Sequence, residues 1–310
     1  MLNHKKAQEI IQNINQFLIG KNEIVELSVI TLLAGGHLLL EDVPGVGKTT
    51  LANVLAASVG CGFSRIQFTP DTLPGDVLGA SIYNMKTGEF SYVPGAIVNH
   101  IVLVDEINRT SPKTQAALLE AMEERQVTVD KVTYPLEEPF FVIATQNPVE
   151  FVGTYHLPEA QLDRFLMKLS IGYPNLTDEH KMSVQFIEGK NSAQATSVVE
   201  RQELLLMQEE VQQITVSDKM VEYIVKLIAA TRESELLVLG GSPRATLGLI
   251  SAGRSCAYVS GRDYVIPDDV QRVLPHVLCH RIMLTVDARM NQKTPEKIIA
   301  DIQSRIRVPI

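Results

Sequence analysis

Glycine, lysine and threonine residues cluster in the stretch Leu38 to Ala52, in an order that could bind an anion. Three leucines precede a loop containing Gly45 and Gly47, and Lys48-Thr49 opens a segment whose apolar residues recur at helical spacing. A strand, a glycine loop and a helix N-terminus offer backbone N–H donors and a favourable dipole to phosphate groups. Lys48 would add positive charge, and the Thr49 hydroxyl could bind Mg²⁺. The residues expected around the phosphates are Val43, Pro44, Gly45, Val46, Gly47, Lys48, Thr49 and Thr50.

The stretch departs from the phosphate-loop pattern G-x-x-x-x-G-K-[ST] at its first position. Asp42 stands there in place of glycine, which puts the local geometry of the loop in doubt. The alternative interpretation is an ordinary glycine turn that joins a strand to a helix. Polar residues elsewhere in the chain must decide between the two.

Two further polar groups follow apolar runs that are typical of buried strands. Asp105-Glu106 follows the run Ile101–Val104, and Asn147 lies just beyond the run Phe140–Thr145. The carboxyl ends of parallel strands share one edge of a sheet, where ligands bind. If these strands are neighbours, Asp105 would orient the water shell of Mg²⁺, Glu106 would polarise an attacking water molecule, and Asn147 would hold that water or sense the γ-phosphate. Each group alone could be a solvated turn, but their order favours a nucleotide site.

Hydrophobic periodicity predicts the elements that must position these residues. Buried strands are expected at 38–40, 65–68, 101–104, 140–145 and 166–171. The helices expected among them cover 5–18, 22–33, 112–124 and about 159–165. After Pro174 the pattern changes to consecutive helices, expected at 178–188, 200–213, 217–232, 244–259 and 267–283. This order predicts a three-layer αβα domain with a parallel sheet, followed by an all-helical domain.

Two β-hairpins are expected as additions to the α/β domain. Ala80–Tyr83 and Glu89–Val93 flank a short turn-rich loop, and Gln126–Val129 and Lys131–Tyr134 flank Asp130. Both pairs of strands have the spacing of a hairpin with a short loop.

Composition argues against a general nucleic-acid binder and against a membrane-spanning protein. Lys and Arg number 28 against 36 Asp and Glu, which gives a net charge of −8 and no overall basic field for nucleic acid or an anionic membrane. The three cysteines, Cys61, Cys256 and Cys279, have no paired spacing, which indicates a reducing compartment. The longest largely apolar stretch, Val29 to Leu40, is shorter than the roughly 20 residues of a membrane span. A cytoplasmic protein without membrane insertion is expected.

The chain resembles the AAA+ ATPases, and within them the MoxR group, over nearly its whole length. The segments that carry the resemblance are RIQFTPDTLPGDVLG at 65–79, IVLVDEINRT at 101–110, ATQNP at 144–148, LPEAQLDRF at 157–165 and GSPRA at 241–245. The resemblance implies a P-loop AAA+ core over residues 1–173 and a helical lid domain over 174–310. It also implies that the hairpins at about 80–93 and 126–134 are insertions of one AAA+ clade.

The resemblance assigns further roles to individual residues. Lys48, Thr49, Asp105, Glu106 and Asn147 match the phosphate loop, the Mg²⁺ and water-activating pair, and the first sensor. In LPEAQLDRF, Arg164 looks like an arginine finger that would act on the nucleotide of a neighbouring subunit; the alternative is a surface salt bridge.

Residues of the lid and of the N-terminal segment also match family positions. Arg244 looks like the second sensor, reaching the phosphates from the lid, and the sequence leaves open whether it acts in its own subunit or the next. Ile19 and Gly20 match the stretch that lines the adenine pocket. The cofactors implied are ATP and Mg²⁺.

The function implied is that of an Mg²⁺-dependent ATPase that remodels or matures a partner protein. The resemblance implies a homo-oligomeric ring, expected to be a hexamer. Clients of MoxR-like proteins often carry a von Willebrand factor A domain. An AAA+ motor acting on nucleic acid is the alternative, and the acidic balance counts against it. A GTP switch is a third hypothesis, but the chain has no Asn-Lys-x-Asp tetrad.

Overall fold

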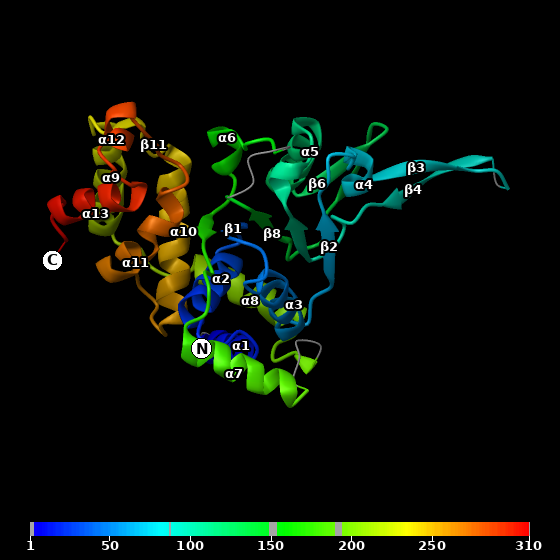
Figure 1. Cartoon of the computed structure of the whole chain (residues 1–310), viewed down its shortest axis with the longest axis horizontal. Helices are drawn as coiled ribbons and strands as arrows, with labels where there is room; N and C mark the ends of the chain where they lie inside the picture. The colour runs from blue at the N-terminus through cyan, green and yellow to red at the C-terminus, as the bar shows by residue number, and fades with distance from the viewer. Residues whose placement is uncertain (1–2, 87, 149–153, 190–193, 310) are drawn as a thin grey trace.

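The computed structural model describes residues 3–86, 88–148, 154–189 and 194–309. Figure 1 shows an α/β core at the centre, a group of helices from the C-terminal part of the chain on the left, and a long hairpin that projects to the right. Among the described residues, no helix combines the length and the apolar character needed to cross a bilayer.

The core is built on a five-stranded sheet with the order β2-β5-β8-β1-β9, in which every neighbouring pair is parallel. Its strands are β1 (Leu38–Glu41), β2 (Phe63–Gln67), β5 (Ile101–Asp105), β8 (Phe141–Gln146) and β9 (Met167–Leu169). Leu38 of β1 lies opposite Ile143 on one side and Met167 on the other. β1 leads into the phosphate loop, β5 ends at Asp105 and β8 ends just before Asn147. These three strands lie side by side in the order β5-β8-β1, which confirms the arrangement expected from the sequence.

Alternate residues of the strands face two separate hydrophobic clusters, as a three-layer fold requires. Leu38, Leu40 and Leu103 belong to one cluster, whereas Leu39 and Val102 belong to the other. The first cluster is covered by α1 (His4–Asn15), α2 (Asn22–Leu33), α3 (Lys48–Ser58) and α8 (Arg201–Gln212). The second is covered by α4 (Pro74–Leu78) and α5 (Pro112–Glu124).

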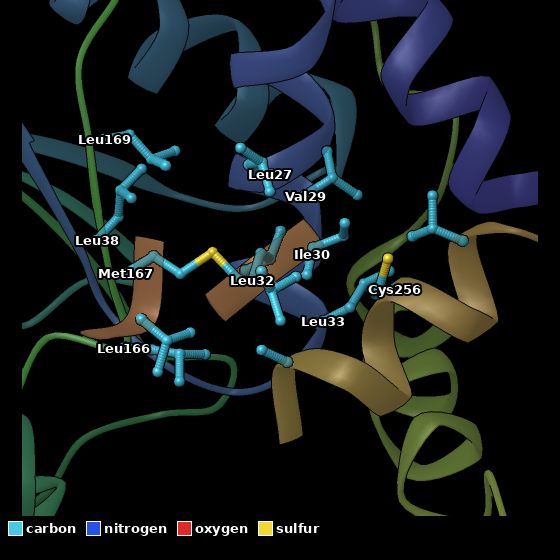
Figure 2. Packing of buried hydrophobic residues seen from close by; sticks show 14 of the residues in the cluster. Leu27, Val29, Ile30, Leu32, Leu33, Leu38, Leu166, Met167, Leu169 and Cys256 are labelled. Atoms are coloured by element: carbon cyan, nitrogen blue, oxygen red, sulfur yellow. The ribbon is translucent and has the colours of Figure 1, made fainter. Parts of the chain in front are cut away.

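Helix α2 joins the sheet to the C-terminal helices. Eight of its residues are buried, as expected for a helix that is apolar nearly all round. Figure 2 shows side chains of α2, including Ile30 and Leu33, packed between Met167 of β9 and Cys256 of α10 (Pro243–Val259). Each fully buried aliphatic side chain contributes about 1.5–3 kcal/mol, so this continuous cluster holds α10 firmly against the core.

The C-terminal part contains α9 (Asp218–Arg232), α10, α11 (Pro267–Leu278), α12 (Val286–Met290) and α13 (Pro295–Arg305). A two-stranded ribbon of β10 (Leu237–Leu239) and β11 (Met283–Leu284) lies among them. The strands of this ribbon are too short to show an alternating hydrophobic pattern in the sequence. The helix expected to reach residue 283 ends at Leu278, and β11 begins at Met283. Helices α12 and α13 were also not predicted. The α/β fold with a helical lid is nevertheless confirmed.

Two predicted elements near the sheet are shorter than expected. α6 (Glu159–Leu162) does not reach residue 165, because Leu166 must donate its N–H to the His37 carbonyl oxygen, at 2.8 Å, as the chain enters β9. The strand expected at 166–171 is limited to Met167–Leu169, because the carboxylate of Asp42 takes the backbone N–H groups that follow.

Both hairpins are present. β3 (Gly79–Asn84) pairs with β4 (Glu89–Pro94), and β6 (Gln126–Val129) pairs with β7 (Val132–Pro135). Thr87, in the predicted loop of the first hairpin, lies outside the described residues. The β3–β4 hairpin extends far from the core (Figure 1).

Helix α7 (Leu176–Ile187) and α8 follow the sheet in sequence, and α8 packs on both α2 and α10. Gln208 of α8 donates to the carbonyl oxygen of Leu32, at 2.7 Å. The division of the chain at residue 173 stays a prediction.

Candidate functional site

The loop between β1 and α3 has the backbone geometry of an anion site. Gly45 and Gly47 have φ values of 86° and 101°, in the left-handed region that glycine adopts without strain. Gly47 is the N-cap of α3 and has no side chain to accept from the first helical N–H groups. Those donors stay available to a ligand, and the helix dipole favours a negative charge there.

Lys48 lines a cleft of about 350 Å³. Its Nζ donates to the backbone carbonyl oxygen of Asp42, at 2.8 Å. Burial lowers the pKa of Lys48, and the carboxylates of Asp42, Asp105 and Glu106 oppose this shift. The cleft is lined by Pro44, Gly45, Gly47, Lys48, Thr49, Thr50, Arg65, Gln67, Asp105, Glu106 and Thr145. Lysine, glycine loop and acid pair therefore converge at one place, as predicted.

Thr145 of β8 connects the acid pair to the neighbouring strand. Its Oγ1 donates to Asp105 Oδ1 at 3.2 Å and accepts from the Glu106 N–H at 2.9 Å. Glu106 has a φ of 58°, a left-handed conformation that is uncommon outside glycine and is often found at functional sites. The backbone turn at the end of β5 thus directs the Glu106 side chain into the cleft while Asp105 stays buried.

Two residues of β2 hold these carboxylates, and the sequence analysis gave them no role. Arg65 Nε lies 2.6 Å from Asp105 Oδ2, and Gln67 Nε2 donates to Glu106 Oε2 at 2.8 Å. They alternate with buried Ile66 at the end of a predicted strand. Two polar side chains on one face of that strand, at the edge where Asp105 and Glu106 were expected, were the signal that could have identified them.

Asn147 follows the last residue of β8 at the same edge of the sheet and is 8% exposed. The neighbouring Gln146 carbonyl oxygen accepts from the Asp42 N–H, at 3.1 Å. Asn147 therefore lies beside the phosphate loop, although it does not line the cleft itself.

Asp42 has a structural explanation. It is only 6% exposed, and its carboxylate accepts from the N–H groups of Ile171 and Gly172 and from the Ser170 hydroxyl. The distances to Gly172 N and Ser170 Oγ are both 3.1 Å. The side chain that replaces the expected glycine thus points away from the cleft and ties the end of β1 to the segment after β9.

Ile19 and Gly20 lie behind the phosphate loop. A Cβ on Gly47 would lie 3.0 Å from the side chain of Leu18, so the turn that contains Ile19 is close to the loop. Gly20 has a φ of 75°, and a Cβ there would overlap the Asp178 side chain of α7. Next to it, Lys21 Nζ donates to the carbonyl oxygens of Ile171 and Tyr173. Neither Ile19 nor Gly20 lines the phosphate cleft itself.

The structure places Arg164 and Arg244 together, but away from the phosphate loop. Both contact Glu123 in the last turn of α5: Arg164 Nε lies 2.8 Å from Oε2, and Arg244 Nη2 donates to Oε1. The hydrogen bond from Arg244 is the main reason why the pKa of Glu123 is lowered, and Arg164 adds to the shift. Glu123 and both arginines line one hollow with Gly35, Gly36 and His37, the residues that precede β1.

The two groups therefore lie at opposite edges of the sheet. The phosphate loop, Asp105 and Glu106 follow the carboxyl ends of their strands, whereas the arginines lie beside the residue that enters β1 at its amino end. β1, which separates these residues from the phosphate loop, has four residues, which at about 3.3 Å each span roughly 13 Å. An arginine side chain does not extend that far, so neither arginine reaches the cleft of its own subunit in this conformation.

The donor set of the cleft fits Mg²⁺. Mg²⁺ is usually held by one or two protein oxygens together with phosphate and water oxygens. The Thr49 hydroxyl and the Asp105 carboxylate both line the cleft and supply such oxygens. Among the described residues no cluster of three His, Cys, Asp or Glu side chains forms a cage for a metal ion, and a nucleotide-bound Mg²⁺ does not need one.

Comparison with known proteins agrees with this geometry. The ATPase family associated with various cellular activities (AAA) matches residues 37–167, and the AAA lid domain matches residues 229–302. The uncharacterized protein YeaC of Bacillus subtilis (strain 168) is 50% identical, over 99% of this chain and 96% of its own length. Chaperone MoxR1 of Mycobacterium tuberculosis is 43% identical, over 97% of this chain and 82% of its own length.

A solved structure shares the whole architecture. The crystal structure of a Cytophaga hutchinsonii protein described as a candidate ATPase superimposes with a TM-score of 0.92 at 37% identity, over 99% of this chain and 96% of that one. The matched core contains the phosphate loop, Asp105, Glu106, Asn147 and Arg164, and the matched lid contains Arg244. The chain belongs to the MoxR family of AAA+ ATPases.

Proposed function

We propose that the protein hydrolyses ATP in an Mg²⁺-dependent manner at sites shared between subunits of a ring, expected to be a hexamer. The observation that carries the proposal is the separation of the two catalytic groups. Each subunit has a phosphate cleft at one edge of its sheet. Arg164 and Arg244, which both contact Glu123, lie at the other edge, the arginine edge. A second copy that brings its arginine edge to the first copy's cleft would complete the site.

Within one subunit, the cleft residues have distinct roles. The N–H groups of the phosphate loop and Lys48 bind the phosphates, and Glu106 accepts a proton from the attacking water while Asn147 helps to position it. Thr49 and Asp105 would hold Mg²⁺, which when bound supplies positive charge to the phosphate oxygens. Ile19 and Gly20, close behind the loop, would contact the base.

The arginine edge supplies the charge that the cleft lacks. Arg164 and Arg244 carry two positive charges and share the single carboxylate of Glu123, so the group has a net positive charge. Arginine donors aimed at a transferring phosphoryl group stabilise the charge that develops in the transition state. Both arginines are accordingly assigned to the nucleotide of the neighbouring subunit, Arg164 as the finger and Arg244 as the second sensor.

The use of this ATPase activity is proposed from the relatives. MoxR1 is named a chaperone, and MoxR-like proteins are associated with the maturation of partners that often contain a von Willebrand factor A domain. We therefore expect a protein client in the cytoplasm, remodelled as subunits move during hydrolysis.

Mixed assemblies test the shared site directly. Arg164→Ala subunits keep their own cleft, and Lys48→Ala subunits keep their arginines, so each variant should be nearly inactive alone while the mixture recovers part of the ATP turnover. Assembly is followed by light scattering with ATP present. A protein that stays monomeric with turnover independent of its concentration, or assembled mixtures without recovery, would contradict the proposal. Salt-sensitive stimulation by DNA would instead favour a nucleic-acid motor.

A further inference from the structure

The backbone on both sides of Arg164 is held by one buried arginine of the lid. Arg281, just beyond α11, is 5% exposed. Its Nε donates to Asp163 Oδ1 at 2.6 Å, and its Nη2 donates to the carbonyl oxygens of Asp163 at 3.1 Å and Phe165 at 2.7 Å. Its Nη1 donates to the carbonyl oxygen of Leu166 at 3.0 Å and to that of Val277 in α11.

These contacts use all five N–H donors of the guanidinium, and four of them go to residues 163–166. Burying a charged group is unfavourable unless it is paired and hydrogen-bonded, so a buried arginine with every donor satisfied fixes its surroundings in one arrangement. The only member of the 163–166 segment whose backbone Arg281 does not contact is Arg164 itself, whose side chain extends toward Glu123.

The same aspartate links the finger segment to Arg244. Asp163 Oδ2 accepts from the Ser242 hydroxyl at 3.1 Å, while its other oxygen pairs with Arg281. Ser242 is the N-cap of α10 and lies two residues before Arg244. A short polar path therefore connects the residue before Arg164 with the helix start that carries Arg244.

We propose that Arg281 is a positioning residue for the arginine edge. It fixes the backbone around Arg164 and, through Asp163 and Ser242, sets the position of Arg164 relative to Arg244. The lid and the finger segment then present both arginines to the neighbouring nucleotide as one unit. The inference rests on the proposed function, since the position of Arg164 matters for turnover only if Arg164 acts on that nucleotide.

The test uses Arg281→Lys, which keeps the charge but loses the planar fork of donors, and the milder Asp163→Asn. Misplacement of a catalytic group by about 1 Å can lower turnover by about 100-fold, so both variants should lose about 10- to 100-fold in kcat. Binding of a fluorescent ATP analogue to their own clefts should stay within about 2-fold of the unaltered protein, since the cleft lies at the other edge.

Complementation separates positioning from a general structural role. Mixing either variant with Lys48→Ala subunits should restore turnover to the level of the Arg164→Ala mixture, because the Lys48→Ala subunit supplies a correctly held finger. A merely destabilised subunit would lose its own cleft and would not be rescued. Thermal unfolding, followed by circular dichroism, shows whether each variant is folded. If Arg281→Lys is not folded, Asp163→Asn provides the test.

Arg272→Lys is the matched control. Arg272 lies on α11, the helix that precedes Arg281, and pairs with Glu26 of α2 at 2.6 and 2.8 Å rather than with residues 163–166. It should keep turnover within about 2-fold. The inference is wrong if Arg281→Lys and Asp163→Asn keep full turnover, if they are not rescued while Arg164→Ala is, or if Arg272→Lys behaves like them. If Arg164→Ala itself is not rescued, the shared site fails, and the inference with it.

Discussion

The two edges of the sheet are built in different ways. At the phosphate edge, Lys48 is held by a contact within the phosphate loop, and Asp105 and Glu106 are held by Thr145 of the adjacent strand. At the arginine edge, Arg164 and Arg244 come from segments 80 residues apart and meet on a carboxylate from a third. The first edge contains the residues proposed to bind the nucleotide and to activate water, whereas the second contributes two positive charges. The difference supports the proposal that each subunit carries two halves of different sites.

The largest effect should come from the phosphate edge. Glu106→Gln keeps the size of the side chain but removes the base, so turnover should fall by about 100- to 10,000-fold. ATP affinity, measured with a fluorescent analogue, should change by less than about 2-fold, because the donors of the loop and Lys48 remain. An equal loss of affinity and turnover would show that Glu106 binds nucleotide rather than activating water. The trapped variant is also the best form for co-purifying a client.

Arg244→Ala tests whether Arg244 acts from the arginine edge on the nucleotide of the neighbouring subunit. Loss of a donor to the transition state should reduce turnover by about 100- to 1,000-fold, with affinity at the variant's own cleft unchanged. Arg254→Ala, on the same helix but away from Glu123, is the control and should change turnover little. If Arg244→Ala instead weakens nucleotide binding to its own subunit, the lid must move to the phosphate edge and the separation of the two edges breaks down.

Gln67→Ala should have a smaller effect, in the opposite direction. Gln67 Nε2 donates to the Glu106 carboxylate, which restrains this base in the nucleotide-free cleft. Removing a hydrogen bond of about 0.5–1.5 kcal/mol should raise basal turnover by about 2- to 10-fold. Steady-state ATPase assays without a client measure it, and Gln67→Glu, which repels Glu106, is a useful comparison. A fall in turnover would mean that Gln67 holds Glu106 in its active orientation.

The smallest effect is expected from Glu123→Gln. The side chains of this ion-pair group are partly exposed, so the change should cost only about 0–1 kcal/mol of unfolding free energy. Because the pairing lowers the pKa of Glu123 below 4.5, its contribution is present above pH 4.5 and is lost as the pH falls through the lowered value. Thermal melts of the two proteins should therefore converge in acid. A difference that grows in acid would contradict the pairing.

The phosphate edge could be predicted from the sequence because its geometry is local. Gly45, Gly47, Lys48, Asp105 and Glu106 each lie within a few residues of a strand end, and parallel strands bring such ends together. The hydrophobic runs predicted where the strands lie, whereas their order in the sheet was supplied by the structure. Asp42 was the exception, because its partners at 170–172 lie about 130 residues along the chain.

The arginine edge could not be predicted in the same way. Nothing near Arg164 or Arg244 in the sequence indicates that both pair with Glu123, and Arg281 lies 118 residues from Asp163. These contacts depend on how the lid docks on α2 through a hydrophobic cluster that fixes no particular polar pairs. Likewise, α6 ends early because of a backbone hydrogen bond to His37, which periodicity does not reveal.

The opposed edges also set a direction for the proposed assembly. A heterologous contact between unlike edges repeats from one copy to the next, which gives a closed ring if the rotation closes and an open filament if it does not. A two-fold dimer that paired one edge with the same edge of its partner would complete no site. An open arc would leave one cleft and one arginine pair unused at its ends, so activity per subunit should rise until closure. In a closed ring, the nucleotide state of each subunit would be sensed by the neighbour on one side only, and information would travel around the ring in a single sense.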